Sequence, residues 1–337
     1  MTLKRATLFF LPLASFIVFF WLSQMNKHPN SVWIYASIYK EVVADFDEAL
    51  RREFPELRIF WYQSGSENVA ARVNAELSTG STHAQILMTS DPFWYLELKR
   101  AGHLFPYSSR ASSDLPHKYR DPENTFMINR LPIGVIAYDK SVISKNLAPR
   151  SWDDLTHPKW RNKLTMPSPL ESGTATTFVS QLVRQKGWDY FKALQRNNLL
   201  ASGGNSAVIQ RIENKEMPMG IVLLENALQA QKRGSPVEIV YPSEGVILVP
   251  SPIALIASSE VNDSTKQVYD FFFSEKAQEI FVKHHVYSPL KPSLFPAGAR
   301  PFSEIEKTVF DWDANILEEL QRTKDADKKT FTELIIK

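Results

Sequence analysis

Cysteine is absent from this 337-residue chain. The absence excludes a disulfide framework, thiol catalysis, zinc sites with cysteine ligands and a lipid-modified N-terminal cysteine. It leaves the redox compartment open, because a protein without thiols tolerates oxidising and reducing surroundings alike. Internal repeats and a long Gly/Ser linker are also missing. The length is enough for two domains, and the lack of a linker argues against joining them by a simple tether.

Most sequence signatures of catalysis are missing too. The chain has no P-loop, no dinucleotide-binding glycine fingerprint, no nucleophile elbow and no H-E-x-x-H zinc motif. The one adjacent histidine pair, His284-His285, does not share a helix face, which argues against a metal site. We therefore expect no enzyme activity, no metal and no cofactor. An extracellular hydrolase using Asp91 or Glu225 is the weakest alternative, because no nucleophile, base and orienting group form a set.

Charge of either sign is not in excess. The chain has 39 Lys and Arg against 37 Asp and Glu, and removing Lys4 and Arg5 leaves 37 of each sign. A nucleic-acid binder would normally show a basic excess, so no nucleic-acid partner is expected.

The N-terminal segment indicates export. Lys4 and Arg5 precede an uncharged, apolar stretch over residues 6–26, which is typical of an export signal. The stretch is longer than a usual signal core, lacks an A-x-A site and comes close to the length that spans a bilayer. Residues 1–26 are therefore either a cleaved signal peptide or a retained anchor in which residues 6–22 hold the protein on the outer face of the inner membrane. Both alternatives predict a location outside the cytoplasm, in the periplasm.

After residue 31, strand-like and helix-like segments alternate, which indicates an α/β fold with mainly parallel strands. Two stretches, 130–135 and 247–253, combine strand-forming residues with proline and predict passages between two lobes. This division assigns residues 31–131 and 252–337 to one lobe and 132–251 to the other. The charged run 324–329 is interpreted as a solvated helix face.

Three short loops follow predicted strands and open predicted helices. They are residues 36–38, 64–66 and 172–174. A helix N-terminus has unpaired N–H groups and partial positive charge, so it can bind an anion. Each serine could instead be an ordinary N-cap, which is the simpler interpretation for any single loop. If the loops converge, they predict an anion site built from Ser37, Ser64, Gly65, Ser66, Ser172, Gly173 and Thr174.

Other polar residues also follow predicted strands. They are Ser90, Asp91, Asn205, Ser206, Glu225 and Glu244. Ligands of open α/β sheets bind beyond the carboxyl ends of the strands, so these residues predict a polar cleft. Such a cleft suits a polyhydroxylated or phosphorylated small molecule. The hydroxyls and helix ends would hold its anionic group, and Asp91, Asn205, Glu225 and Glu244 would read hydroxyls or an amine.

The block at residues 148–174 carries a family resemblance, from Ala148-Pro149-Arg150-Ser151-Trp152 through His157-Pro158-Lys159-Trp160 to Ser172-Gly173-Thr174. With Ser64-Gly65-Ser66, residues 271–278 and Phe310-Asp311-Trp312, it resembles the periplasmic solute-binding proteins of ABC transporters, in the group that binds ferric ion, organic phosphates or phosphonates. The resemblance implies a two-lobed (type II) periplasmic-binding-protein fold, with two mixed sheets flanked by helices and a central cleft. It also implies a monomer that closes by a hinge and docks on a membrane permease.

The sequence departs from one branch of this family. Ferric-binding members carry adjacent tyrosines after the strand that matches residues 219–224, where this chain has Leu224-Glu225-Asn226. The departure favours the branch that binds organic phosphates and phosphonates. Ferric-ion binding, and a membrane-tethered sensor that contacts a signalling partner such as a sensor kinase, remain as alternatives.

Overall fold

The computed structural model describes residues 30–257 and 261–336. The predicted signal peptide or anchor therefore lies outside the described residues. Within the described ranges, no helix has both the length and the apolar character needed to span a membrane.

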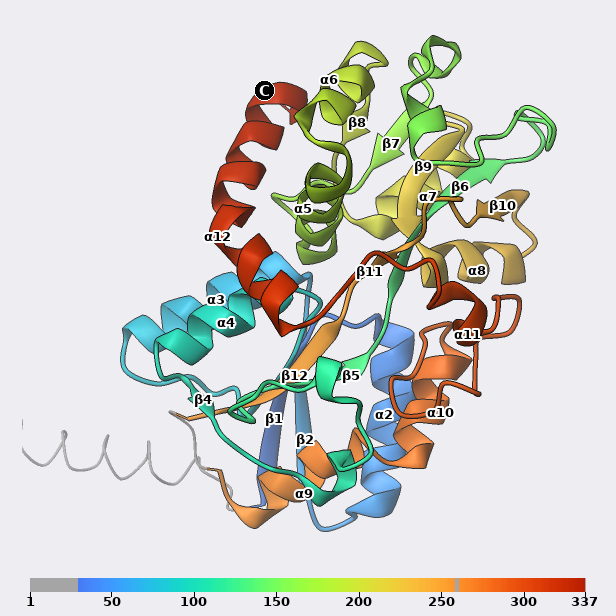
Figure 1. Ribbon diagram of the computed structural model, residues 1–337. Coiled ribbons are helices and arrows are strands. Elements are labelled where there is room, and N and C mark those ends of the chain that lie inside the picture. Colours follow the sequence, from blue (N-terminus) through green and yellow to red (C-terminus); the bar gives the residue numbers. More distant parts are fainter. Residues whose placement is uncertain (1–29, 258–260, 337) are drawn as a thin grey trace, which may run out of the picture.

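Two mixed sheets form the centres of two lobes (Figure 1). The first sheet has the order β2-β1-β3-β12-β4, with β5 also paired to β12, and the second has the order β10-β6-β9-β7-β8, with β11 also paired to β6. The first lobe's strands are β1 (Ser31–Ala36), β2 (Arg58–Gln63), β3 (Ile86–Met88), β4 (Leu104–Phe105), β5 (Met127–Arg130) and β12 (Ser251–Ile256). The second lobe's strands are β6 (Ile133–Asp139), β7 (Leu164–Met166), β8 (Leu200–Ala201), β9 (Met219–Leu223), β10 (Val237–Val240) and β11 (Ile247–Leu248).

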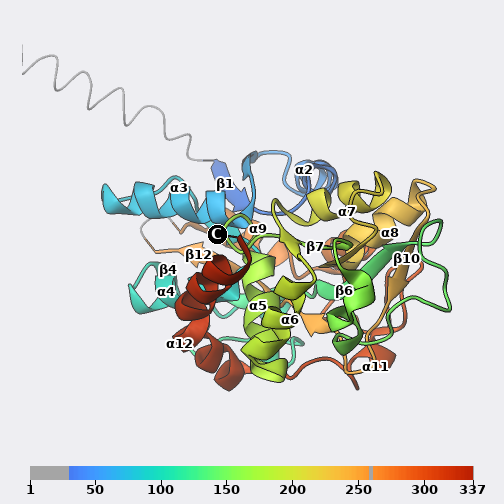
Figure 2. The same cartoon turned by 90° about the horizontal axis from the view of Figure 1, so that it is seen from above.

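Helices flank both sheets, as Figures 1 and 2 show. Those beside the first sheet are α2 (Lys40–Glu53), α3 (Ser66–Ser78), α4 (Pro92–Arg100), α9 (Asp263–Phe271), α10 (Glu275–Lys283) and the short α11 (Phe302–Ile305). Those beside the second are α5 (Gly173–Lys186), α6 (Trp188–Arg196), α7 (Asn205–Glu213) and α8 (Leu224–Lys232). The long C-terminal helix is α12 (Ala314–Phe331). The predicted α/β class with two mixed sheets is confirmed.

The prediction of mainly parallel strands holds for only part of each sheet. β1 runs parallel to β2 and β3, and β7 runs parallel to β8 and β9. In contrast, β12 is antiparallel to β3, and β6 is antiparallel to β9. The reason is the passage between lobes. β6 and β12 each begin where the chain arrives from the other lobe, so they start at the edge where the parallel strands end.

The chain changes sheets at residues 131–132, between β5 and β6, and at residues 249–250, between β11 and β12. The C-terminal helix does not belong to the first lobe alone, contrary to the sequence-based division. α12 packs against both α4 and α5, and Phe331 meets the ring of Phe191 in the second lobe with centroids 5.2 Å apart. Its charged run is not simply solvated either, because Lys324 pairs with Glu97 and Lys328 pairs with Glu67.

Local sequence explains how the helices are held. In α2, the apolar stripe Val42, Phe46, Ala49 and Leu50 is buried, and Phe46 contacts the ring of Phe281 from α10 with centroids 4.9 Å apart. α5 ends at Gly187, whose φ of 71° is a left-handed conformation that favours glycine. Both helices are thus fixed by packing, so their N-terminal ends have defined positions at the cleft.

Candidate functional site

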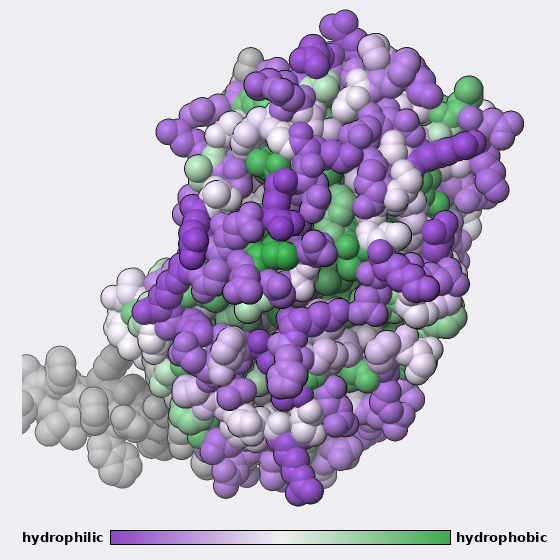
Figure 3. Space-filling model, viewed as in Figure 1, coloured by the Kyte–Doolittle hydropathy of each residue, from purple (hydrophilic) through white to green (hydrophobic). Residues whose placement is uncertain are grey.

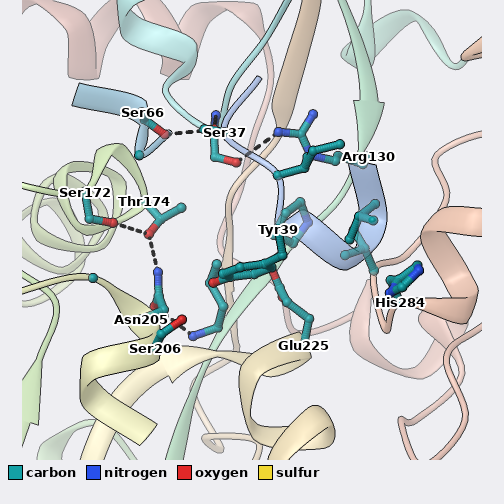
Figure 4. A pocket seen from close by; sticks show the side chains of 18 of the residues that line it. Ser37, Tyr39, Ser66, Arg130, Ser172, Thr174, Asn205, Ser206, Glu225 and His284 are labelled. Carbon is teal, nitrogen blue, oxygen red and sulfur yellow. Dashed lines mark hydrogen bonds between the residues drawn. The ribbon is translucent and has the colours of Figure 1, made fainter. Parts of the chain in front are cut away.

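A cavity of about 210 Å³ lies between the carboxyl ends of the two sets of parallel strands (Figure 4). The first lobe contributes the segments that follow β1, β2, β3 and β5, and the second lobe contributes those that follow β7, β8 and β9. Hydrophilic residues cover most of the face seen in Figure 3, and a hollowed band at mid-height exposes hydrophobic side chains. The cavity therefore lies where open α/β sheets bind ligands, shared between two lobes.

Ten of the predicted site residues line this cavity. They are Ser37, Ser64, Gly65, Ser66, Ser90, Ser172, Thr174, Asn205, Ser206 and Glu225. They come from six separate loops or helix starts, which the fold brings together across the boundary between the lobes.

Five helices begin at this cavity: α2, α3, α5, α7 and α8. None of the five has a side-chain hydrogen bond that caps its N-terminus. Four helices that begin elsewhere, α4, α9, α10 and α12, are capped by Asp91, Asn262, Ser274 and Asp313 respectively. The helices α6 and α11 are also uncapped and lie away from the cavity. The first turn of a helix has backbone N–H groups without partners inside the helix, and these five helices direct theirs to the cavity walls. The partial positive charges of the five N-termini add up at the cavity.

On the first-lobe wall, serine hydroxyls bind one another. The Ser66 hydroxyl donates to Ser37 Oγ at 3.0 Å, and the Ser90 N–H donates to the same oxygen at 3.2 Å. Asn68 Nδ2 donates to Ser64 Oγ at 3.2 Å. Ser66 and Ser90 are buried, so these bonds fix the hydroxyls in place at the cavity. Their arrangement suits an acceptor-rich group such as a phosphate, to which hydroxyls and N–H groups donate.

On the second-lobe wall, a chain of hydrogen bonds runs from α5 to α7. The hydroxyls of Ser172 and Thr174 lie 2.9 Å apart, and Asn205 Nδ2 donates to Thr174 Oγ1 at 2.8 Å. Asn205 Oδ1 in turn accepts the Leu223 N–H at 3.1 Å. Ser172 is the N-cap residue of α5, yet its hydroxyl binds Thr174 instead of the helix backbone. The simpler interpretation, an ordinary serine N-cap, is therefore wrong for this loop.

Arg130 is a charged cavity residue that the sequence analysis did not propose as a site residue. Its side chain, at the end of β5, is buried with a residue exposure of 2%. Nη2 donates to Ser90 Oγ at 3.1 Å and Nη1 donates to Asn129 Oδ1 at 3.1 Å. Among the described residues, no carboxylate forms an ion pair with it. Loss of hydration on burial lowers its pKa to about 10. The sequence signal that could have identified Arg130 is a single cation within the otherwise uncharged stretch 127–135.

Glu225 is a second unusual ionisable group in the cavity. It lies in the first turn of α8 with an exposure of 6%, and its Oε2 has no hydrogen-bond partner among the described residues. Burial raises its pKa to about 8, and the nearby charge of Arg130 opposes that rise. Burial thus favours the neutral form of this carboxyl, which weakens the compensation that Glu225 gives to the positive charge of Arg130.

The structure places three predicted site residues outside the cavity lining. Asp91 caps α4, where its Oδ1 accepts the N–H groups of Phe93 at 3.0 Å and Trp94 at 3.3 Å. Burial raises the pKa of Asp91 to about 6. Gly173 sits where α5 approaches α3 and α4, and a Cβ on it would lie 2.7 Å from Asp91 Cβ. Asp91 and Gly173 thus approach each other across the boundary between the lobes.

Glu244 is the third, and its expected role in the cleft is wrong. Its carboxylate accepts the N–H groups of Trp152 at 3.1 Å and Asp153 at 3.2 Å, and it pairs with Lys186 at 3.1 Å. It thus anchors the turn at residues 153–156 inside the second lobe. A carboxylate after a strand looks the same in the sequence whether it faces a cleft or caps a neighbouring turn.

Two further residues at the cavity mouth were not foreseen. The Tyr39 hydroxyl of the first lobe donates to Asn226 Oδ1 of the second at 2.9 Å. His284 Nε2 lies 2.7 Å from Asp45 Oδ2, which also pairs with Lys283. Figure 4 shows Tyr39 between the serine side of the cavity and Glu225. Within the part of the chain that the structure describes, no three His, Asp or Glu side chains are grouped as metal ligands would be.

Comparisons with known proteins agree with this geometry. Residues 81–318 match the profile of a family described as bacterial extracellular solute-binding protein. A probable ABC transporter periplasmic-binding protein of Sinorhizobium fredii is 24% identical over 232 residues, and a putative 2-aminoethylphosphonate-binding periplasmic protein of Salmonella paratyphi A is 23% identical over 235. The matches cover 64% and 66% of this chain, and the same shares of the two relatives.

Two solved structures show the same fold. The periplasmic binding protein AfuA of Actinobacillus pleuropneumoniae, with fructose-6-phosphate bound, matches with a TM-score of 0.79 and 20% identity, over 90% of this chain and 98% of its own. Iron-bound HitA of Pseudomonas aeruginosa matches with a TM-score of 0.77 and 18% identity, over 89% and 99%. Because the family profile spans most of the folded chain and both structures share its two-lobed architecture, the resemblance inferred from the sequence is confirmed. The chain belongs to the bacterial extracellular solute-binding proteins, whose place is outside the cytoplasm.

Proposed function

We propose that this protein binds a small phosphorylated or phosphonate-type organic anion in the cavity between its lobes and delivers it unchanged to the permease of an ABC uptake system. The observation that carries the proposal is Arg130, a buried guanidinium without a carboxylate partner that lines a cavity entered by five uncapped helix N-termini. Burying a charge is costly unless it is paired. An anionic ligand would supply the missing partner.

The cavity wall supports a phosphoryl group in particular. Ser37, Ser66 and Thr174 offer hydroxyls, and the first turns of α3, α5 and α7 offer N–H groups. A phosphate or phosphonate has several acceptor oxygens, so it can use donors that arrive from different directions. Two similar proteins are associated with ligands of this class: one is a putative 2-aminoethylphosphonate-binding protein, and the other, AfuA, has fructose-6-phosphate bound.

Ferric ion is the rival ligand, because iron-bound HitA has the same fold. After β9 the chain carries Leu224 and Glu225, and both are buried. Burial raises the pKa of the Glu225 carboxyl to about 8, which favours its neutral form. A neutral carboxyl is a poor ligand for a hard cation, and the nearby guanidinium would repel one. These residues favour an anion over a metal ion.

The action we propose is a shift between open and closed arrangements of the lobes. A contact already joins the lobes where the Tyr39 hydroxyl donates to Asn226 Oδ1 at 2.9 Å. A ligand held by both walls binds the closed arrangement better, and only this difference in affinity can shift the equilibrium. The closed form would then be the one that the permease recognises.

Calorimetry of the exported domain tests the proposal. The titrants are inorganic phosphate, hexose phosphates, alkylphosphonates and ferric citrate, with the unphosphorylated sugars as controls. We expect binding of at least one phosphorylated or phosphonate compound and none of its unphosphorylated parent. Tight binding of ferric citrate, with no heat from any phosphoryl compound, would reject the proposal in favour of ferric-ion binding.

A further inference from the structure

A second compartment of about 250 Å³ adjoins the cavity just described. We refer to it as the outer compartment and to the first as the inner cavity. The two share Tyr39, Val42, Ser206, Glu225 and His284. The remaining walls of the outer compartment come from α7 and α8 of the second lobe and from the start of α2. The two spaces therefore adjoin at these shared residues, among them Tyr39 and Glu225.

The polar lining of the outer compartment differs in kind from that of the inner cavity. It includes the carboxylate of Glu41 and the amides of Gln210 and Gln229, whose oxygens accept and whose NH2 groups donate. Arg233 lies 3.3 Å from Glu213, so these two opposite charges offset each other. The inner cavity instead presents hydroxyls, helix N-termini and a guanidinium. The outer compartment thus adds carboxylate and amide acceptors to a cavity dominated by donors.

Glu225 marks the boundary between the two ends. Its side chain is more than nine-tenths buried and lines both spaces, and its Oε2 has no hydrogen-bond partner among the described residues. Figure 4 shows it beside Tyr39, whose hydroxyl is engaged by Asn226. A buried oxygen without a partner costs free energy unless a donor arrives. A carboxyl keeps acceptor lone pairs whether or not it is protonated, so Glu225 can accept a hydrogen bond from a donor on the ligand.

We propose that the outer compartment is a second subsite, and that the ligand is a two-ended molecule. Its anionic group occupies the inner cavity, and a tail passes Tyr39 and ends in a hydrogen-bond donor, a hydroxyl or an ammonium group, that is accepted by Glu225 and the outer compartment. This inference rests on the proposed function and adds to it the chemistry of the ligand's far end. Plain phosphate fills only one of the two subsites.

The test is a calorimetric comparison of three series of phosphate esters with graded chain length. Alkyl phosphates end in a methyl group, hydroxyalkyl phosphates in a hydroxyl and aminoalkyl phosphates in an ammonium group. Inorganic phosphate measures the inner cavity alone. We expect one donor-bearing series to bind about tenfold or more tightly than the alkyl esters of equal length, which corresponds to one good hydrogen bond to a charged or buried group. Which series gains distinguishes a polyol-like tail from an amine.

Variants locate the gain. Gln229 lines only the outer compartment, so Gln229→Trp should fill it and abolish the preference for donor-bearing esters while leaving inorganic phosphate affinity unchanged. Lys232→Trp is the matched control, because this exposed residue of α8 lines neither space and should change nothing. Retained phosphate affinity also shows that each variant is folded.

Two outcomes would overturn the inference. In the first, alkyl esters bind as tightly as both donor-bearing series at every length. In the second, Gln229→Trp leaves the preference intact. In either case inorganic phosphate binding would still support the proposed anion site. If no phosphate or phosphate ester binds the unaltered protein, the proposed function itself fails and the second subsite with it.

Discussion

Replacing Arg130 by methionine separates binding from stability. The guanidinium is buried, donates to Ser90 and Asn129, and has no ion-pair partner among the described residues. In the liganded protein we expect it to donate to the anion. A hydrogen bond between charged groups contributes about 1.5–3 kcal/mol. Arg130→Met should therefore raise the dissociation constant for a phosphoryl ligand about 10- to 150-fold.

The same substitution should not destabilise the empty protein by a comparable amount. An unpaired buried charge carries a desolvation cost, and methionine fills a similar length of the site without one. Ser90 Oγ and Asn129 Oδ1 each lose the hydrogen bond from Arg130, and each loss opposes this gain by about 1–3 kcal/mol. We therefore expect the unfolding midpoint of the empty variant to stay near that of the unaltered protein, while the ligand-induced rise in the midpoint largely disappears.

Calorimetry and thermal unfolding, each with and without ligand, make the measurement. Arg211→Met is the control, because Arg211 is also partly buried and hydrogen-bonded, to Ser202 O at 2.8 Å, but lines neither compartment. It should leave affinity unchanged. The reasoning is refuted if Arg130→Met binds phosphoryl ligands as tightly as the unaltered protein, or if both arginine variants weaken binding equally.

Three further predictions concern residues around the cavity. Gly173→Ala should weaken ligand binding although Gly173 does not line the cavity. A Cβ there would lie 2.7 Å from Asp91 Cβ and 3.1 Å from Ser66 Cβ and would hold the lobes apart. Small-angle scattering with ligand should show a larger radius of gyration for the variant than for the unaltered protein. Asp91→Ala removes the cap of α4 and should lower the free energy of unfolding by about 1 kcal/mol in urea titrations, with affinity retained. Burial raises the pKa of Glu225 from 4.5 to about 8, so the native state keeps a proton that the unfolded chain releases, and the free energy of unfolding should fall as pH rises between about 4.5 and 8. Urea titrations of Glu225→Gln over that range should lack this part of the fall; an identical pH dependence in both proteins would contradict the assignment.

Local patterns were sufficient for much of the fold. Strand and helix alternation follows from side-chain periodicity, which is a property of neighbouring residues, and the strand expected at residues 219–224 is β9 (Met219–Leu223). The serine loops could be placed at the carboxyl ends of strands for the same reason. Short strands such as β4 and β8 show too few residues for a period to be visible, so pairing with neighbouring strands defines them.

The sequence by itself therefore determined the α/β class, the passages between lobes and the loops that line the cleft, because all of these depend on short-range pattern. Only the tertiary structure decided what each charged residue does. Arg130 and Glu225 are buried at the cavity, whereas Glu244 caps a turn and Lys324 pairs with Glu97 across packed helices. The role of a charge depends on which partners and how much water surround it, and residues far apart in the chain supply those surroundings.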